Sequence, residues 1–192
     1  RGFDTFIKEL QETGKETTLF IFGDKSRSGM DATLKRMGIK GFNKNTCTCE
    51  NIHLILIPMI EQHLYDSLLC CTDFNLVRGE DSLARAVCAG KPFIWNAYLQ
   101  DNRYQNVKVE ALLKVLSGFF EDHEVLNSYS DLMLQFNDAE RECPLQVTSE
   151  RYHAFFRDLN KIEHAMRKMS YFVDRYCDLI KNFGEFLHKF RA

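Results

Sequence analysis

The fold is decided by residues 71–95, Cys71-Thr-Asp-Phe-Asn-Leu-Val-Arg-Gly-Glu-Asp-Ser-Leu-Ala-Arg-Ala-Val-Cys-Ala-Gly-Lys-Pro-Phe-Ile-Trp95. Its apolar and polar residues alternate in blocks that predict a strand, a tight polar turn, a helix and a second strand. Gly90 stands where a left-handed residue commonly ends a helix. The predicted blocks are the strand at 74–77, the turn at 78–82, the helix at 83–89 and the next strand from 92.

The turn Arg78-Gly79-Glu80-Asp81-Ser82 is where chemistry is expected. Ligands of α/β sheets bind beyond the carboxyl ends of strands, and a helix start there attracts phosphate. Gly79 allows close backbone approach, while Arg78 and Ser82 offer a cation and a hydroxyl. Glu80 and Asp81 would repel phosphate but suit ribose or sugar hydroxyls. Alternatively, Asp81 or Ser82 merely caps the helix, and this choice stays open.

Upstream, two runs of β-branched and apolar residues predict buried strands at 17–22 and 52–57. Helical patterns separate the four predicted strands, which indicates an α/β fold with a parallel sheet and right-handed crossovers. Residues 39–50 predict a loop or a short edge strand. Residues 23–29 have the Gly and Ser content of a phosphate loop without its order, so we expect a plain connecting loop.

Downstream of residue 105 the pattern becomes helical and amphipathic. We expect a core at 1–105 and, at 106–192, carboxyl-terminal helices that pack on the same domain. Cys143-Pro144 interrupts the helices, and Gly184 predicts a second break.

Composition excludes several classes of protein. The chain has 192 residues and a net charge of −2, which argues against sequence-independent nucleic-acid binding. No run of about 18 apolar residues exists, so no membrane partner is expected. The chain begins with Arg1, and its first residues resemble the inside of a domain, so we expect a fragment.

The seven cysteines are odd in number and irregularly spaced, which favours buried thiols in a reducing cytoplasm. Cys47-Thr-Cys49 lacks a second pair at zinc spacing, and the six histidines form no metal pattern. We therefore expect no metal, and no Ser-His-Asp or Cys-His arrangement supports nucleophilic catalysis.

A longer set of residues resembles the EarP family, the protein-arginine rhamnosyltransferases of translation elongation factor P. These residues are Gln62-His-Leu-Tyr65-Asp66-Ser-Leu68-Leu69, Asp73-Phe-Asn-Leu-Val-Arg-Gly-Glu-Asp-Ser82, Arg85-Ala86 and Ala89-Gly-Lys-Pro-Phe-Ile-Trp95, followed by Tyr98 and Gln100.

The resemblance implies one Rossmann-like half of a two-domain glycosyltransferase-B fold, with residues 1–105 as the nucleotide-sugar-binding core. It implies an inverting transfer of L-rhamnose from dTDP-β-L-rhamnose to an arginine guanidinium of elongation factor P, without a cofactor. This chain resembles the carboxyl-terminal, donor-binding half. The missing N-terminal domain is its implied partner, so the chain alone is expected to be inactive.

The resemblance also implies roles for individual residues. Glu80 would be the catalytic residue, the acidic side chain that matters most for turnover, and Gln62 would lie near the thymine base. Donor-binding positions would also include Arg78, Gly79, Asp81, Ser82 and Met59, the last where the family commonly has an aromatic residue. Asn96 and Leu99 depart from the family pattern. Two alternatives stay open: an inactive or split nucleotide-sugar-binding module, and the donor domain of another glycosyltransferase-B enzyme.

Overall fold

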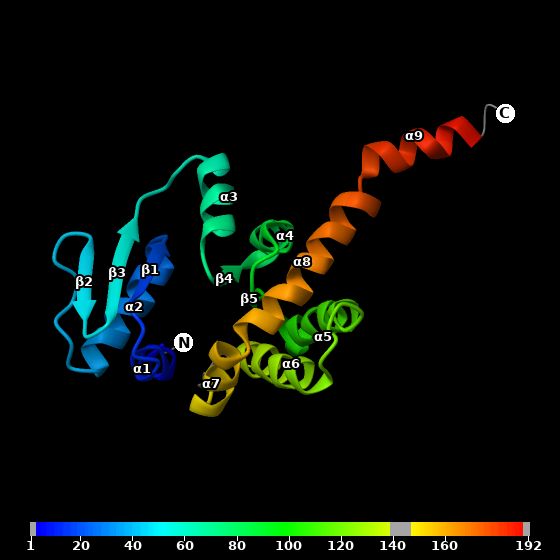
Figure 1. Ribbon diagram of the computed structural model, residues 1–192. Coiled ribbons are helices and arrows are strands. Elements are labelled where there is room, and N and C mark those ends of the chain that lie inside the picture. The colour runs from blue at the N-terminus through cyan, green and yellow to red at the C-terminus, as the bar shows by residue number, and fades with distance from the viewer. Residues whose placement is uncertain (1–2, 139–146, 190–192) are drawn as a thin grey trace.

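The computed structural model describes residues 3–138 and 147–189 as an α/β molecule (Figure 1). Its strands are β1 (Thr17–Phe22), β2 (Thr46–Cys49), β3 (Ile52–Ile57), β4 (Asn75–Arg78) and β5 (Phe93–Asn96). Its helices are α1 (Asp4–Glu12), α2 (Asp24–Arg36), α3 (Gln62–Cys71), α4 (Gly79–Ala89), the 3₁₀ turn η1 (Asp101–Arg103), α5 (Tyr104–Leu116), α6 (His123–Asn137), α7 (Ser149–Arg157), α8 (Leu159–Tyr176) and α9 (Leu179–Lys189).

The strands form two small sheets. β1 pairs in parallel with β3, with Thr17 opposite Ile52, and β4 pairs in parallel with β5, with Asn75 opposite Phe93. The α/β class with parallel strands and flanking helices is thus confirmed. The four strands do not form one sheet, however, because within the described residues no ladder joins β1 to β4. β2 is the edge strand of residues 39–50, and it runs antiparallel to β3.

A single apolar core runs through both parts of the chain. β3 buries alternate residues, Ile52, Leu54 and Leu56, as expected of a strand with one covered face. Phe74, just before β4, contacts the rings of Phe155 and Phe156 in α7. The core therefore continues past residue 105, and the boundary between 105 and 106 stays a prediction.

Side chains of α6 cover the outer edge of β5. The Tyr129 hydroxyl donates to the carbonyl of Phe93 at 2.6 Å, and Asn137 Nδ2 donates to the carbonyl of Trp95 at 2.8 Å. Asn137 Oδ1 also accepts from the backbone N–H of Ala97 at 2.9 Å. Because these three backbone groups are satisfied by side chains, β5 ends the sheet without a further strand.

A predicted loop and a predicted helix break differ from the structure. Residues 24–29, expected as a loop, form the start of α2, because Gly23 with φ of 76° already makes the turn. The last helices separate between Tyr176 and Leu179, and α9 passes through Gly184 without a break. Cys143-Pro144 lies outside the described residues.

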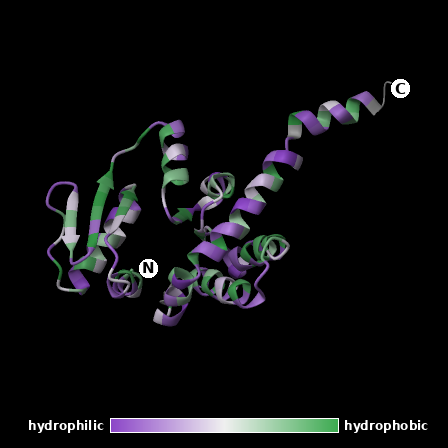
Figure 2. Cartoon of the chain, viewed as in Figure 1, coloured by the Kyte–Doolittle hydropathy of each residue, from purple (hydrophilic) through white to green (hydrophobic). Residues whose placement is uncertain are grey.

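α8 crosses the molecule diagonally, and α9 continues away from the body (Figure 1). Hydrophobic segments alternate with hydrophilic ones along α9 (Figure 2), and Ile180 and Phe183 are exposed there. None of the described helices is both long and apolar enough to cross a lipid bilayer.

Candidate functional site

The predicted turn is the start of a helix. β4 ends at Arg78 and α4 begins at Gly79, whose φ is 77°. Arg78 is the N-cap residue, and its side chain makes no cap hydrogen bond. Glu80, Asp81 and Ser82 therefore lie inside the first turn, so the interpretation of Asp81 or Ser82 as the cap is wrong. The two carboxylates nevertheless complement the positive end of the helix dipole.

Gly79 is enclosed by side chains from the segment after β5. The indole Nε1–H of Trp95 donates to the carbonyl of Gly79 at 3.0 Å. A Cβ atom on Gly79 would lie 2.8 Å from the ring of Tyr98, closer than carbon atoms can approach. The guanidinium carbon of Arg78 lies 5.2 Å from the same ring's centroid, within range of a cation–π contact. The backbone angle therefore favours glycine here, and a larger residue would also have to displace the half-exposed Tyr98 ring.

Glu80 is paired with a lysine from a distant part of the sequence. The ammonium of Lys108, in α5, donates to Glu80 Oε1 at 2.8 Å. This hydrogen bond, followed by one from the backbone N–H of Glu80 itself, lowers the pKa of the Glu80 carboxyl. About half of the Glu80 side chain is exposed, so the carboxylate is ionised, oriented and still accessible.

Asp81 shares a guanidinium with residues of α3. Arg85 Nε donates to Asp81 at 2.9 Å, one helical turn away, and Nη1 contacts both carboxylate oxygens of Asp66 at 2.9 Å. With its amide oxygen facing α4, Gln62 also accepts from Arg85. The structure thus brings Gln62 and Asp81, two predicted donor-binding residues, to one cation.

The other predicted residues surround this cluster less closely. Ser82 is half-buried in the first turn of α4. Met59 lies in the connection between β3 and α3 and is 89% exposed. Asn96 donates at 3.4 Å to the carbonyl of the next residue, Ala97, and Leu99 is partly exposed. The geometry therefore gathers Arg78, Gly79, Glu80, Asp81 and Gln62, whereas Met59 contributes only an exposed side chain nearby in sequence.

Sequence reasoning gave no role to three residues of this site. Arg85 could have been found, because an Asp and an Arg four residues apart on a helix commonly pair. Lys108 carries no local signal, because Glu80 lies 28 residues away, and nothing local shows that Asn137 holds Trp95 and Ala97, about 40 residues away. Only the packing of α5 and α6 places them.

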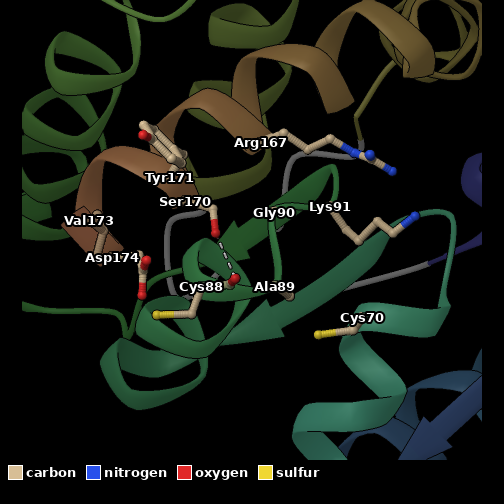
Figure 3. A pocket seen from close by; sticks show the side chains of 10 residues that line it. All are labelled: Cys70, Cys88, Ala89, Gly90, Lys91, Arg167, Ser170, Tyr171, Val173 and Asp174. Atoms are coloured by element: carbon tan, nitrogen blue, oxygen red, sulfur yellow. Dashed lines mark hydrogen bonds between the residues drawn. The ribbon is translucent and has the colours of Figure 1, made fainter.

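One cavity lies away from the cluster, at the other end of α4. A cavity of about 600 Å³ opens between the carboxyl end of α4 and the face of α8 (Figure 3). There the Ser170 hydroxyl donates to the carbonyl of Cys88 at 2.7 Å, while Lys91 and Arg167 both pair with Glu163. These three polar side chains are thus paired within the protein, and the cavity is separated from the predicted residues by the length of α4.

The described thiols divide into two groups, and Cys143 lies outside the described residues. Cys47 and Cys49 are buried, as predicted, and burial raises the pKa of both. The prediction is wrong for Cys70, Cys71, Cys88 and Cys177, which are exposed. Across residues 3–138 and 147–189, no three His, Cys, Asp or Glu side chains are grouped to hold a metal ion.

Known proteins resemble this chain along almost its whole length. The model of the family described as "Elongation-Factor P (EF-P) rhamnosyltransferase EarP" matches residues 1–188. The chain belongs to the EarP family. It is 35% identical over 93 residues to a protein-arginine rhamnosyltransferase of Shewanella oneidensis, and 33% identical over 120 residues to one of Neisseria meningitidis. A solved EarP chain, from work on EarP-mediated arginine glycosylation of translation elongation factor EF-P, shares the fold with a TM-score of 0.72 at 20% identity.

These matches cover only part of each EarP relative. The aligned residues are 48% of this chain and 23% of the Shewanella protein, and 60% and 30% for the Neisseria protein. The structural match covers 97% of this chain and 56% of the solved EarP chain. Family membership is therefore shown for a chain that corresponds to about half of the solved relative.

Proposed function

We propose that this chain is the donor-binding half of an inverting protein-arginine rhamnosyltransferase. The donor would be dTDP-β-L-rhamnose and the acceptor an arginine of translation elongation factor P. A missing N-terminal domain would supply the rest of a glycosyltransferase-B cleft. The observation that carries this proposal is the cluster at the start of α4, where Gln62 and Asp81 share Arg85 and Glu80 stands ordered beside them.

The cluster offers distinct groups to each part of such a donor. The first turn of α4 has backbone N–H groups and a dipole that attract a diphosphate, with Gly79 and Ser82 beside it. Gln62, at the start of α3, carries an amide that can recognise the edge of a thymine base. Arg78 adds a cation at the carboxyl end of β4, and exposed Met59 can pack against the base.

Glu80 is the proposed catalytic residue. Its carboxylate is ionised, because the pKa is lowered by Lys108, and it faces solvent rather than the core. An ionised carboxylate beside the donor sugar can bind a sugar hydroxyl or orient a cationic arginine acceptor. No metal or other cofactor is part of this proposal.

Donor selectivity tests the proposal on the chain itself. We expect dTDP-rhamnose and dTDP to bind more tightly than UDP-sugars in a calorimetric titration. Equal affinity for the thymidine and uridine compounds would instead favour the donor domain of another glycosyltransferase-B enzyme.

Turnover separates an active half from an inactive or split module. The chain is combined with the missing N-terminal domain and elongation factor P, and the mass of the factor is measured. We expect the gain of one rhamnose, and a loss of about 100-fold or more in Glu80→Gln, because the substitution removes a charge that stabilises and orients the reacting groups. Asp24→Asn, at the equivalent start of α2, is the matched control and should leave activity unchanged. No rhamnosylation by the wild type would favour the inactive module.

A further inference from the structure

Lys108 reaches the start of α4 from outside the stretch that decides the fold. Its Nζ donates to Glu80 Oε1 at 2.8 Å across a separation of 28 residues. The side chain is 31% exposed, so its stem is largely covered while its charge faces the site. This contact is therefore a product of tertiary packing and not of local helix pairing.

The crossing segment, residues 97–108, places this lysine. It leaves β5, passes through η1 and enters α5, and two successive residues, Asn102 and Arg103, have φ values of 55° and 56°. Left-handed backbone costs a non-glycine residue about 1–3 kcal/mol and persists only where the surroundings impose it. Buried Gln105 fixes the turn, because its Oε1 accepts from the backbone N–H of Gln100 at 3.1 Å.

Both ends of the crossing segment contact the same turn of α4. Near its start, the Tyr98 ring covers Gly79, and at its end Lys108 holds Glu80. The strained turn between them therefore brings an aromatic ring and a cation together over the proposed diphosphate position.

The charges at the start of α4 show what Lys108 compensates. Two adjacent carboxylates would oppose an anion that the helix dipole and N–H groups attract. Asp81 shares the single positive charge of Arg85 with Asp66. Glu80 is neutralised by Lys108. Without that cation, an uncompensated negative charge would face the incoming phosphates.

We propose that Lys108 is a positioning residue of the donor site, which draws the Glu80 carboxylate aside and neutralises it so that a nucleoside diphosphate can occupy the start of α4. This inference rests on the proposed function. It adds a residue from α5 to a site otherwise built from α3, β4 and α4.

The test compares two probes on the same variants. Affinities for dTDP and for thymidine, which lacks phosphates, are measured by calorimetry for the wild type, Lys108→Met and Lys108→Arg. We expect Lys108→Met to weaken dTDP binding about two- to fivefold, since pairs this exposed couple modestly, and to leave thymidine binding unchanged. Lys108→Arg keeps the charge and should bind as the wild type does. Lys114→Met, an exposed lysine on the same helix, is the matched control.

A double variant then isolates the charge of Glu80. In Glu80→Gln/Lys108→Met the uncompensated carboxylate is gone, so dTDP affinity should return to the wild-type value. A dTDP affinity unchanged in Lys108→Met, a parallel loss of thymidine binding, or no recovery in the double variant would each overturn the inference alone. A wild type that binds no dTDP would overturn the proposed function together with it.

Discussion

Two junctions in this protein turn a parallel strand into a helix with the same local device. Gly23 joins β1 to α2 with a φ of 76°, and Gly79 joins β4 to α4 with a φ of 77°. Each glycine is followed by an acidic residue in the first helical turn. Around Gly23, however, an added Cβ would meet nothing within 4 Å, whereas at Gly79 it would meet Tyr98 at 2.8 Å.

This difference shows what makes a turn into a candidate site. The local sequence sets the backbone angle and the helix start at both junctions. At β4–α4, later parts of the chain, Trp95, Tyr98 and Lys108, return and contact the glycine and the first helical turn. The β4–α4 junction, here called the covered junction, owes its geometry to residues that follow Gly79 by 16 to 29 positions.

Substitution of the two glycines by alanine should have the largest effect on stability. It separates the cost of the backbone angle from the cost of contact with neighbouring side chains. Gly23→Ala should destabilise the protein by about 1–3 kcal/mol, the cost of a left-handed alanine. Gly79→Ala should cost about 1 kcal/mol more, because the new methyl group displaces the half-exposed Tyr98 ring and its contact with Arg78. Urea unfolding of both variants measures the difference.

Removal of the ring provides the control for that comparison. In the background Tyr98→Ala, the substitution Gly79→Ala should cost no more than Gly23→Ala, because the methyl group then has space. An extra cost that persists without the ring would mean that the covered junction does not depend on Tyr98.

The hydrogen bond of Trp95 should have an intermediate effect. Trp95→Phe keeps an aromatic ring but leaves the Gly79 carbonyl without its donor in a buried position. An unpaired buried group costs about 1–3 kcal/mol, which should appear as a lower midpoint in urea unfolding. A midpoint equal to that of the wild type would show that water replaces the indole and that the junction is open.

Acid pH should have the smallest effect, through the contact between Glu80 and Lys108. The pKa of Glu80 is lowered in the folded protein, chiefly by Lys108, so the contact stabilises the fold above pH 4.5. Its contribution is lost as the pH falls through the lowered pKa, while Lys108, and Arg85 beside the neighbouring Asp81, stay charged. The difference in melting temperature between the wild type and Lys108→Met should therefore disappear in acid. A difference of equal size at neutral and acid pH would exclude Glu80 as the partner.

Much of the fold follows from the sequence, for identifiable reasons. The strands at 17–22 and 52–57 were predicted with their observed bounds, because β-branched runs bounded by polar residues have few alternatives. Gly90 ends α4 with a φ of 64°, as its position predicted. The starts of α2 and α4 were placed too late, since a glycine with positive φ can turn the chain in a single residue.

Only the part of the site that lies in and near the decisive stretch of sequence was predictable. The residues from Arg78 to Ser82 and Gln62 could be named from motif and resemblance, and their roles remain proposals. Lys108, the partner of Glu80, and Asn137, which holds the backbone of Trp95 and Ala97, could not be named, because a lone lysine or asparagine on an amphipathic helix has no feature that identifies a partner far away in sequence. The placement of β1 and β4 in separate sheets could not be predicted either, because alternating strands and helices indicate the order of the elements but not which strands pair.

The indole that holds Gly79 is the only tryptophan in the chain. Its ring is almost fully buried, and its N–H is bonded to the backbone of the turn where the donor is proposed to bind. Ultraviolet emission excited at the red edge of the absorption band therefore arises from one reporter at one place. The protein carries its own optical label for events at the covered junction, and no dye needs to be attached to follow them.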